Sequence, residues 1–156
     1  MIDLDMVQYW VNTSQPPPLN ETIGEFQINS ELTKPTSYSY IYLGKKKNGT
    51  EKKVFKFVKC KRDSLCKIEN EIETMSLVNH PNILKMENYF LFNEYVCIVT
   101  PYIQHQSLHK FIIDNYPSGI PEKMASKIMF QLLSAVDYLH KINIWHRDIK
   151  PDNVLV

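Results

Sequence analysis

The dipeptide Asn48–Gly49 constrains the fold of this chain more than any other feature, because it separates two runs with the composition of β-strands. The run from Ser37 to Leu43 is rich in tyrosine, and the run from Val54 to Val58 is apolar around a single lysine. Asn-Gly between two such runs is the strongest short-range signal for a β-hairpin. The sequence therefore predicts that these two strands pair in antiparallel orientation.

Apolar spacing predicts further elements after this hairpin. A helix is expected from about Ser64 to Val78, followed by a strand pair near Ile83–Phe92 and Tyr95–Val99. A long helical pattern then extends from Pro121 to about His140, and proline is favoured at a first helical position. The predicted fold class is α+β, with five antiparallel strands, one helix inserted among them and further helices after them.

The charge balance gives no overall reason to expect nucleic acid or an anionic membrane as a partner, because 18 Lys and Arg face 17 Asp and Glu. Nine of the 18 basic residues lie between Lys45 and Arg62, but the Asn48–Gly49 turn puts most of them on an exposed hairpin. A solvated charged surface is therefore favoured over a nucleic-acid site. No run of the sequence approaches the ~18 apolar residues of a membrane helix.

Cysteine usage and the N-terminal composition add two expectations. Cys60, Cys66 and Cys97 form no C-x-x-C pair and are typical of reduced thiols in an intracellular protein. The expected location is the cytoplasm, with the nucleus as an alternative. Residues 1–22 contain three consecutive prolines among polar residues, which predicts a flexible proline-rich N-terminal segment.

The last eleven residues, His146 to Val156, carry the densest set of chemically useful side chains. Pro151 prevents the preceding helix from simply continuing, so Asp148 and Asn153 are expected on a loop that leads into a short strand. A carboxylate can accept a hydroxyl proton, the cation of Lys150 can hold a transferring phosphoryl group, and a carboxamide oxygen can bind a hard metal ion. A solvated polar loop is the alternative interpretation.

This run resembles the catalytic loop of eukaryotic protein kinases, whose pattern in the serine/threonine type is H-R-D-x-K-P-x-N. The resemblance extends over about residues 23–156, and it implies a small lobe at about 23–102 and the start of a large lobe at about 103–156. It also implies that Asp148 is the catalytic base, that Lys150 contacts the γ-phosphate and that Asn153 binds magnesium. ATP and Mg²⁺ are then the expected cofactors, and a serine or threonine of a protein is the expected substrate.

The same run argues against a small-molecule phosphotransferase of the aminoglycoside-kinase type. That family resembles H-G-D-x-x-x-x-N, whereas Arg147, Lys150 and Pro151 match the protein-kinase pattern. The helix from Lys127 to His140 resembles that of the calcium/calmodulin- and AMP-activated-type kinases.

A lysine and a glutamate upstream are expected to form an ion pair. Strand alternation puts Lys56 on one face with two valines, and a lone lysine among apolar side chains requires an anion. Lys59 is the rival, but it shares a face with two phenylalanines and fits the register worse. Helical spacing puts Glu71 inside the apolar arc of the predicted helix, so it is the expected partner. The two resemble the β3 lysine and αC glutamate of kinases.

The run from Ile98 to Ile103 resembles the strand and hinge that hold adenine in the family. By this resemblance Thr100 is the gatekeeper, Pro101 offers its carbonyl, and Tyr102 and Ile103 keep the other backbone groups, while Leu108 lies beneath the ring. The complete set of expected nucleotide-binding residues is Ile41, Val54, Lys56, Glu71, Thr100, Pro101, Tyr102 and Leu155.

The sequence departs from the family where a glycine-rich loop is expected. The corresponding residues, Leu32 to Ile41, contain no glycine, and Pro35 has no amide donor. Val54 also replaces the usual alanine, so we expect weakened nucleotide binding, and a pseudokinase or kinase-fold binding module is the alternative to an active kinase. The 156 residues contain no D-F-G metal ligand, so by themselves they are expected to be inactive.

Overall fold

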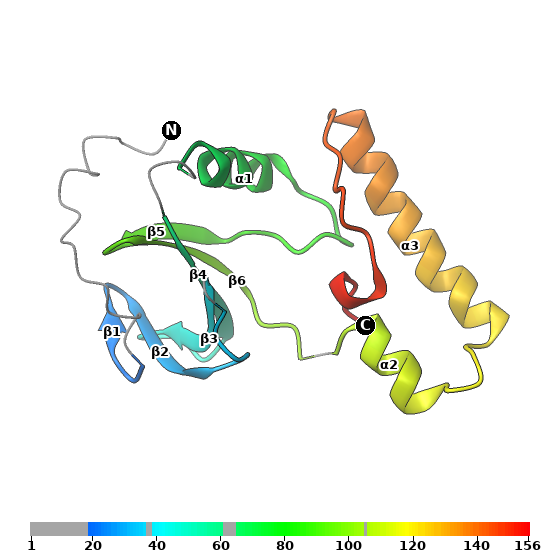
Figure 1. Ribbon diagram of the computed structural model, residues 1–156, viewed down its shortest axis with the longest axis horizontal. Coiled ribbons are helices and arrows are strands. Elements are labelled where there is room, and N and C mark those ends of the chain that lie inside the picture. Colours follow the sequence, from blue (N-terminus) through cyan, green and yellow to red (C-terminus); the bar gives the residue numbers. More distant parts are fainter. Residues whose placement is uncertain (1–18, 37–38, 61–64, 105) are drawn as a thin grey trace. The chain divides into compact units, whose positions relative to one another are not determined.

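The computed structural model describes residues 19–36, 39–60, 65–104 and 106–156, so most of the predicted N-terminal segment lies outside the described residues (Figure 1). In the described part, six strands form one antiparallel sheet in the order β1-β2-β3-β4-β6-β5. The strands are β1 (Thr22–Ile23), β2 (Phe26–Glu31), β3 (Ser39–Lys46), β4 (Lys52–Lys59), β5 (Asn88–Phe92) and β6 (Tyr95–Pro101). The helices are α1 (Leu65–Leu77), α2 (Leu108–Asn115) and α3 (Glu122–Lys141), with a 3₁₀ turn η3 (Pro151–Asn153).

These elements form two compact units along the chain. The first contains the residues up to Leu77 together with Lys85–Tyr102, and thus the whole sheet and α1. The second contains Val78–Leu84 and Ile103–Val156, and thus α2, α3 and η3. The chain therefore passes between the units three times, after Leu77, after Leu84 and after Tyr102.

The predicted hairpin is confirmed as β3 and β4. Lys45 lies opposite Lys52 in the antiparallel register, and the Gly49 N–H donates to the Lys46 carbonyl across 2.9 Å, which closes the turn. The sheet has one strand more than predicted, because β1 pairs with β2 through a turn at Gly24, whose φ is +58°. Two residues are too few to show the alternation on which the prediction depended.

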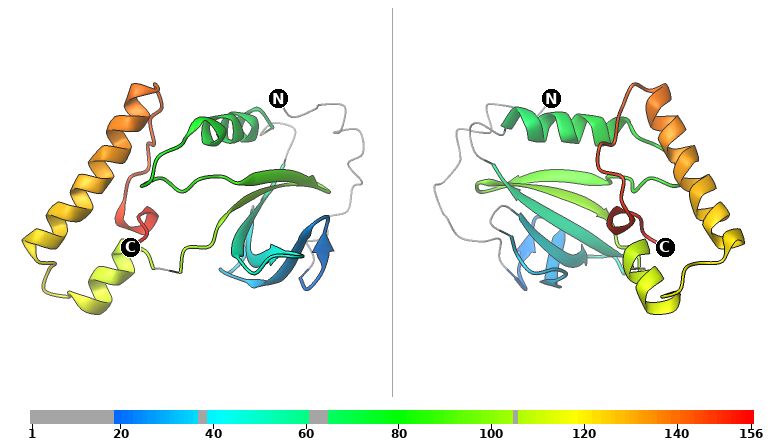
Figure 2. Two further views of the ribbon diagram at one scale, coloured as in Figure 1. Left: turned by 180° about the vertical axis from the view of Figure 1, so that it is seen from behind. Right: turned by 45° about the vertical axis from the view of Figure 1, so that its right-hand side comes forward.

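The alternation predicted for β4 separates two faces of the sheet. Phe55 and Phe57 are fully buried, and they belong to a core with six other residues, which are Phe26, Ile28, Tyr42, Tyr95, Cys97 and Val99. On the opposite face, Ile68 and Ile72 of α1 cluster with Val96 and Ile98 of β6. Figures 1 and 2 show α1 lying along this face. Lys56, next to Phe55, is therefore on the face that α1 covers.

Gly44 of β3 allows a close approach between strands. A Cβ at this position would lie 2.3 Å from the Gln27 carbonyl oxygen and 2.8 Å from the Phe55 ring. The register between β2 and β3 shifts just beside it, between Ile28 and Ser30. No side chain fits there unless the backbone of β2 moves away from β3.

In the second unit, α3 holds the segment Val78–Leu84 by side-chain hydrogen bonds. The Asn79 N–H donates to the Tyr138 hydroxyl across 3.0 Å, and His80 Nε2 lies 3.2 Å from the Ser134 hydroxyl. His80 Nδ1 accepts the Asn82 N–H, which assigns the ring proton to Nε2 and makes Ser134 the acceptor.

We expect Gly44→Ala to lower the free energy of unfolding by about 1–3 kcal/mol, because the added methyl group overpacks the contact with Gln27 and Phe55. Gly49→Ala is the matched control, since its Cβ would come no closer than 3.4 Å to Lys46. Urea unfolding of both variants of the full-length protein measures the difference. Equal stability of the two variants would contradict the close approach.

Candidate active site

The loop after α3 brings the predicted catalytic residues together. After α3 ends at Lys141, Asn143 has a φ of +57°, and the chain then runs to η3 at Pro151–Asn153. The prediction was a loop that leads into a short strand, whereas Asn153 lies in this 3₁₀ turn and only an isolated bridge at Leu155 follows it. The Asn153 N–H donates to the Lys150 carbonyl across 2.9 Å, which folds the chain back on itself. Asp148 lies between Asn143 and this 3₁₀ turn, so the path of the loop determines how close Asp148 comes to Lys150 and Asn153.

The Asp148 carboxylate contacts two of the side chains singled out from the sequence. Lys150 Nζ lies 3.1 Å from Asp148 Oδ2, and Asn153 Nδ2 donates to both the carbonyl oxygen and Oδ2 of Asp148, each across 2.8 Å. The amide nitrogen of Asn153 thus faces Asp148, and its carboxamide oxygen is the atom left for a hard metal ion. A carboxylate, an ammonium and a carboxamide therefore meet within one short loop.

Arg147, which precedes Asp148, has a φ of +64°, in the left-handed region that residues with a Cβ seldom adopt. Such a conformation costs about 1–3 kcal/mol and is found most often at functional sites. The Asp148 N–H donates to His146 Nδ1 across 3.3 Å, which joins the residues on either side of Arg147. The strained residue is thus held by its neighbours.

The ion pair expected between Lys56 and Glu71 is present, with 3.3 Å between Nζ and Oε1. Both side chains are half-exposed, at 44% and 45%, so burial is smaller than the strand pattern suggested. Lys59, the rival, pairs with Glu94 at 2.9 Å instead. The Lys56 ammonium is therefore held by α1, while the Lys59 ammonium is held at the turn between β5 and β6.

Three other predicted nucleotide-binding residues share a sheet face with Lys56. Ile41 lies directly opposite Lys56 in the β3–β4 register, and Val54 lies opposite Thr100 in the β4–β6 register. Thr100 is buried, while Ile41 and Val54 are half-buried. The register thus assembles an apolar surface bordered by the Lys56 cation.

The residues predicted to contact adenine from the hinge and from beneath the ring differ in burial and in hydrogen bonding. The Tyr102 N–H donates to the Lys52 carbonyl across 3.1 Å, so the sheet uses this group, and the Tyr102 ring lies beneath Lys52 Nζ, 5.8 Å from the ring centre. Pro101 ends β6 opposite Lys53. In the second unit, Leu108 is buried at the start of α2, whereas Leu155 is 47% exposed and bridges to Ser107.

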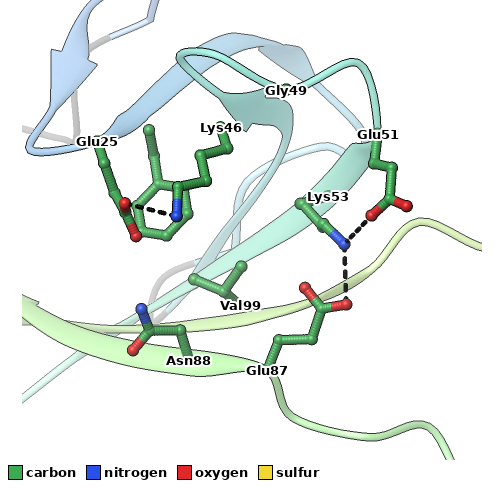
Figure 3. Close-up of a pocket in the computed structure, with 9 residues that line it drawn as sticks. Glu25, Lys46, Gly49, Glu51, Lys53, Glu87, Asn88 and Val99 are labelled. Carbon is green, nitrogen blue, oxygen red and sulfur yellow. Dashed lines mark hydrogen bonds and ion pairs between the residues drawn. The ribbon is translucent and has the colours of Figure 1, made fainter.

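Sequence reasoning missed a hollow of about 320 Å³ on the other face of the sheet, which no predicted site residue lines (Figure 3). Figure 3 shows Lys53 between Glu51 and Glu87, with each carboxylate 2.8 Å from its Nζ. Lys46 pairs with Glu25 at 2.8 Å across the hollow from them. Part of the basic cluster noted in the sequence is therefore neutralised by neighbouring carboxylates.

Comparison with known proteins agrees with this arrangement. Residues 36–156 match the protein kinase domain family. A probable myosin light chain kinase of Dictyostelium discoideum is 35% identical over 134 residues, 86% of this chain and 42% of that protein. Aurora/IPL1-related protein kinase 2 of Caenorhabditis elegans is 32% identical over 139 residues, 86% of this chain and 45% of that protein. This chain thus spans under half the length of these relatives.

The fold itself is also found among solved structures. The crystal structure of Rad53 residues 1–466 in complex with AMP-PNP superposes with a TM-score of 0.74 at 23% identity, covering 85% of this chain and 34% of that one. The curled antiparallel sheet, its one helix and the His146–Asn153 loop define a kinase fold. The chain belongs to the protein kinase family. Among the described residues, no helix has both the length and the apolarity to cross a membrane.

Hydrogen bonds from Lys150 and then Asn153 stabilise the ionised Asp148 carboxylate and lower its pKa below the ordinary value. We expect Lys150→Met to raise this pKa toward that of a free aspartate, because the charged form loses its strongest partner. A ¹³C-detected NMR titration measures the shift. Lys141→Met is the matched control, since Lys141 pairs with Asp137 instead, and it should leave the Asp148 curve unchanged.

The half-exposed Lys56–Glu71 pair is expected to contribute little to stability, because water screens such pairs. Glu71→Gln should therefore change the free energy of unfolding by less than about 1 kcal/mol. Ile72, the next residue, is only 3% exposed. Ile72→Ala should therefore lower the free energy of unfolding by about 2–5 kcal/mol. Denaturant unfolding of both variants measures the contrast, and a larger loss for Glu71→Gln would contradict it.

Proposed function

We propose that the protein binds ATP and transfers its γ-phosphate to serine or threonine hydroxyls of protein substrates. The observation that carries this proposal is the contact of Asp148 with both Lys150 and Asn153 in one loop. The serine/threonine type is supported by Lys150 and Pro151, which match the H-R-D-x-K-P-x-N pattern. Family membership supports ATP as the phosphate donor, and the Rad53 structure of the same fold is a complex with AMP-PNP.

In this proposal the Asp148 carboxylate, which is ionised at neutral pH as any free aspartate is, accepts the proton of the attacking hydroxyl. Lys150, already beside the carboxylate, holds the negative charge of the phosphoryl group during transfer. Lys56 binds the phosphates of the nucleotide, and Glu71 orients its ammonium from α1.

The donors in the loop fit a magnesium ion, since carboxylate and carboxamide oxygens are the ligands that hard cations prefer. Asn153 supplies such a carboxamide oxygen, and the described residues contain no cluster of three acidic, His or Cys side chains for a metal. Magnesium, when bound, neutralises charge on the phosphates. We propose that residues 1–156 alone, with Asn153 but no D-F-G sequence, do not transfer phosphate.

The proposal is tested with radiolabelled ATP and a generic serine/threonine substrate on the whole gene product, and residues 1–156 assayed alone should show no turnover. Asp148→Asn should lower turnover at least about 100-fold, because the proton loses its acceptor. Asp152→Asn is the matched control, an exposed aspartate of the same loop, and it should retain most of the activity. Nucleotide binding without turnover in the wild type would favour the alternative, a pseudokinase or binding module.

A further inference from the structure

A row of polar side chains crosses the sheet of the first unit on the face that carries Lys56. Residues directly opposite each other on antiparallel strands project from the same face of a sheet. The register connects, from β1 to β4, Thr22, Gln27, Lys45 and Lys52. Lys52 precedes Lys56 by four residues of β4, so alternation puts the row on the Lys56 face. Tyr102 extends the row, because its N–H donates to the Lys52 carbonyl across 3.1 Å and Lys52 Nζ lies 5.8 Å from the centre of its ring.

This row contains two neighbouring cations and no carboxylate. Lys45 and Lys52 lie directly opposite each other, and neither forms an ion pair among the residues that the structure describes. Like charges in such positions destabilise a sheet. The other face of the same hairpin differs, because Lys46 and Lys53 each have a carboxylate 2.8 Å from Nζ. The hairpin therefore neutralises the cations of one face and leaves those of the other for an external anion.

The number of cations in the row fits a single phosphate group. Neighbouring strands lie about 4.8 Å apart, so the long side chains of Lys45 and Lys52 can contact the same anion. A phosphate monoester carries a charge of about −1.5 to −2 and three acceptor oxygens, and two ammonium groups balance that charge. Nucleic-acid sites commonly neutralise about six to ten phosphates, and lipid-binding clusters contain about four to eight basic residues. Even with Lys47 at the adjoining turn, the cations of this face are too few for either.

We propose that this row binds a phosphorylated serine or threonine of a partner protein. Lys45 and Lys52 contact the phosphate oxygens through charge-assisted hydrogen bonds. The Gln27 carboxamide and the Tyr102 hydroxyl, on either side of the two lysines, donate to the same phosphate or to the peptide that carries it. Four residues of extended strand span about 13 Å, so this site is distinct from the place proposed for the triphosphate of ATP at Lys56. Its occupation requires no phosphoryl transfer by this protein.

Fluorescence anisotropy tests the proposal with the whole gene product and a labelled degenerate peptide library that has one fixed phosphoserine. The wild type should bind this library at least about tenfold more tightly than the same library after phosphatase treatment, since the charge-assisted hydrogen bonds are then lost. Lys45→Met should weaken binding about fivefold to tenfold, and Lys45→Arg should retain it because the cation is kept. Lys46→Met is the matched control. It removes the same charge from the next residue, on the opposite face and already paired with Glu25, so affinity should stay within about twofold.

Urea unfolding of Lys45→Met separates weaker binding from a folding defect. The urea midpoint of this variant should equal or exceed that of the wild type, because removal of one cation relieves the repulsion from Lys52. A lower midpoint contradicts the unpaired state of the two lysines and overturns the site.

The remaining outcomes decide which anion the row binds. Equal phosphopeptide affinity of Lys45→Met and the wild type overturns the proposal, and so does equal affinity of the wild type for the two forms of the library. A single-stranded oligonucleotide or a phosphatidylserine vesicle that binds more tightly than the phosphopeptide, and loses this binding in Lys45→Met, assigns the row to nucleic acid or to a membrane instead. Saturating ATP should leave the phosphopeptide bound, and its release by ATP overturns the separate site. Phosphopeptide binding by a protein that does not bind ATP overturns the proposed function alone.

Discussion

The register of β4 between β3 and β6 is the constraint on which the rest of the first unit depends. It places Phe55 and Phe57 in a fully buried core and, by alternation, directs Lys56 to the opposite face, under α1. The same register sets Ile41 beside Lys56 and Val54 beside Thr100. A slip by one residue would move the lysine into the aromatic core and take both rings out of it, so the large apolar surface of that core keeps the cation in place.

The sequence predicted the elements whose signal is local and strong. The Asn48–Gly49 hairpin, the α1 helix and the lysine–glutamate pair follow from turn chemistry and from periods of 2.0 and 3.6 residues, and all three are present. β1 was missed because two residues carry no period. The start of β5 was placed several residues early, because Ile83 is apolar but belongs to the second unit and not to the sheet. The hollow beside Lys53 was missed because its carboxylates come from three separate turns and loops.

The residues of the candidate site could be named from the sequence, but the hydrogen bonds among them could not. The order of residues in the His146–Asn153 loop indicated the chemistry, yet no spacing rule shows that Asn153 donates to Asp148 by its amide nitrogen. The same carboxylate oxygen, Oδ2, also contacts Lys150 Nζ, and the two contacts fix the orientation of the carboxylate. Both donors contact Oδ2, so in the proposed reaction Oδ1 is the oxygen that accepts the proton of the substrate hydroxyl.

The Lys56–Glu71 pair shows why stability alone does not explain the site. Lys56 lies on a sheet face with apolar neighbours, where a valine or methionine in its place would gain burial without the loss of hydration that a charge suffers. Exposure of nearly half of each side chain limits the gain from pairing to under about 1 kcal/mol. The pair therefore contributes less to folding than an apolar residue would. What it provides is a cation at a fixed place on the Ile41–Val54 surface, which is useful only if an anion binds there.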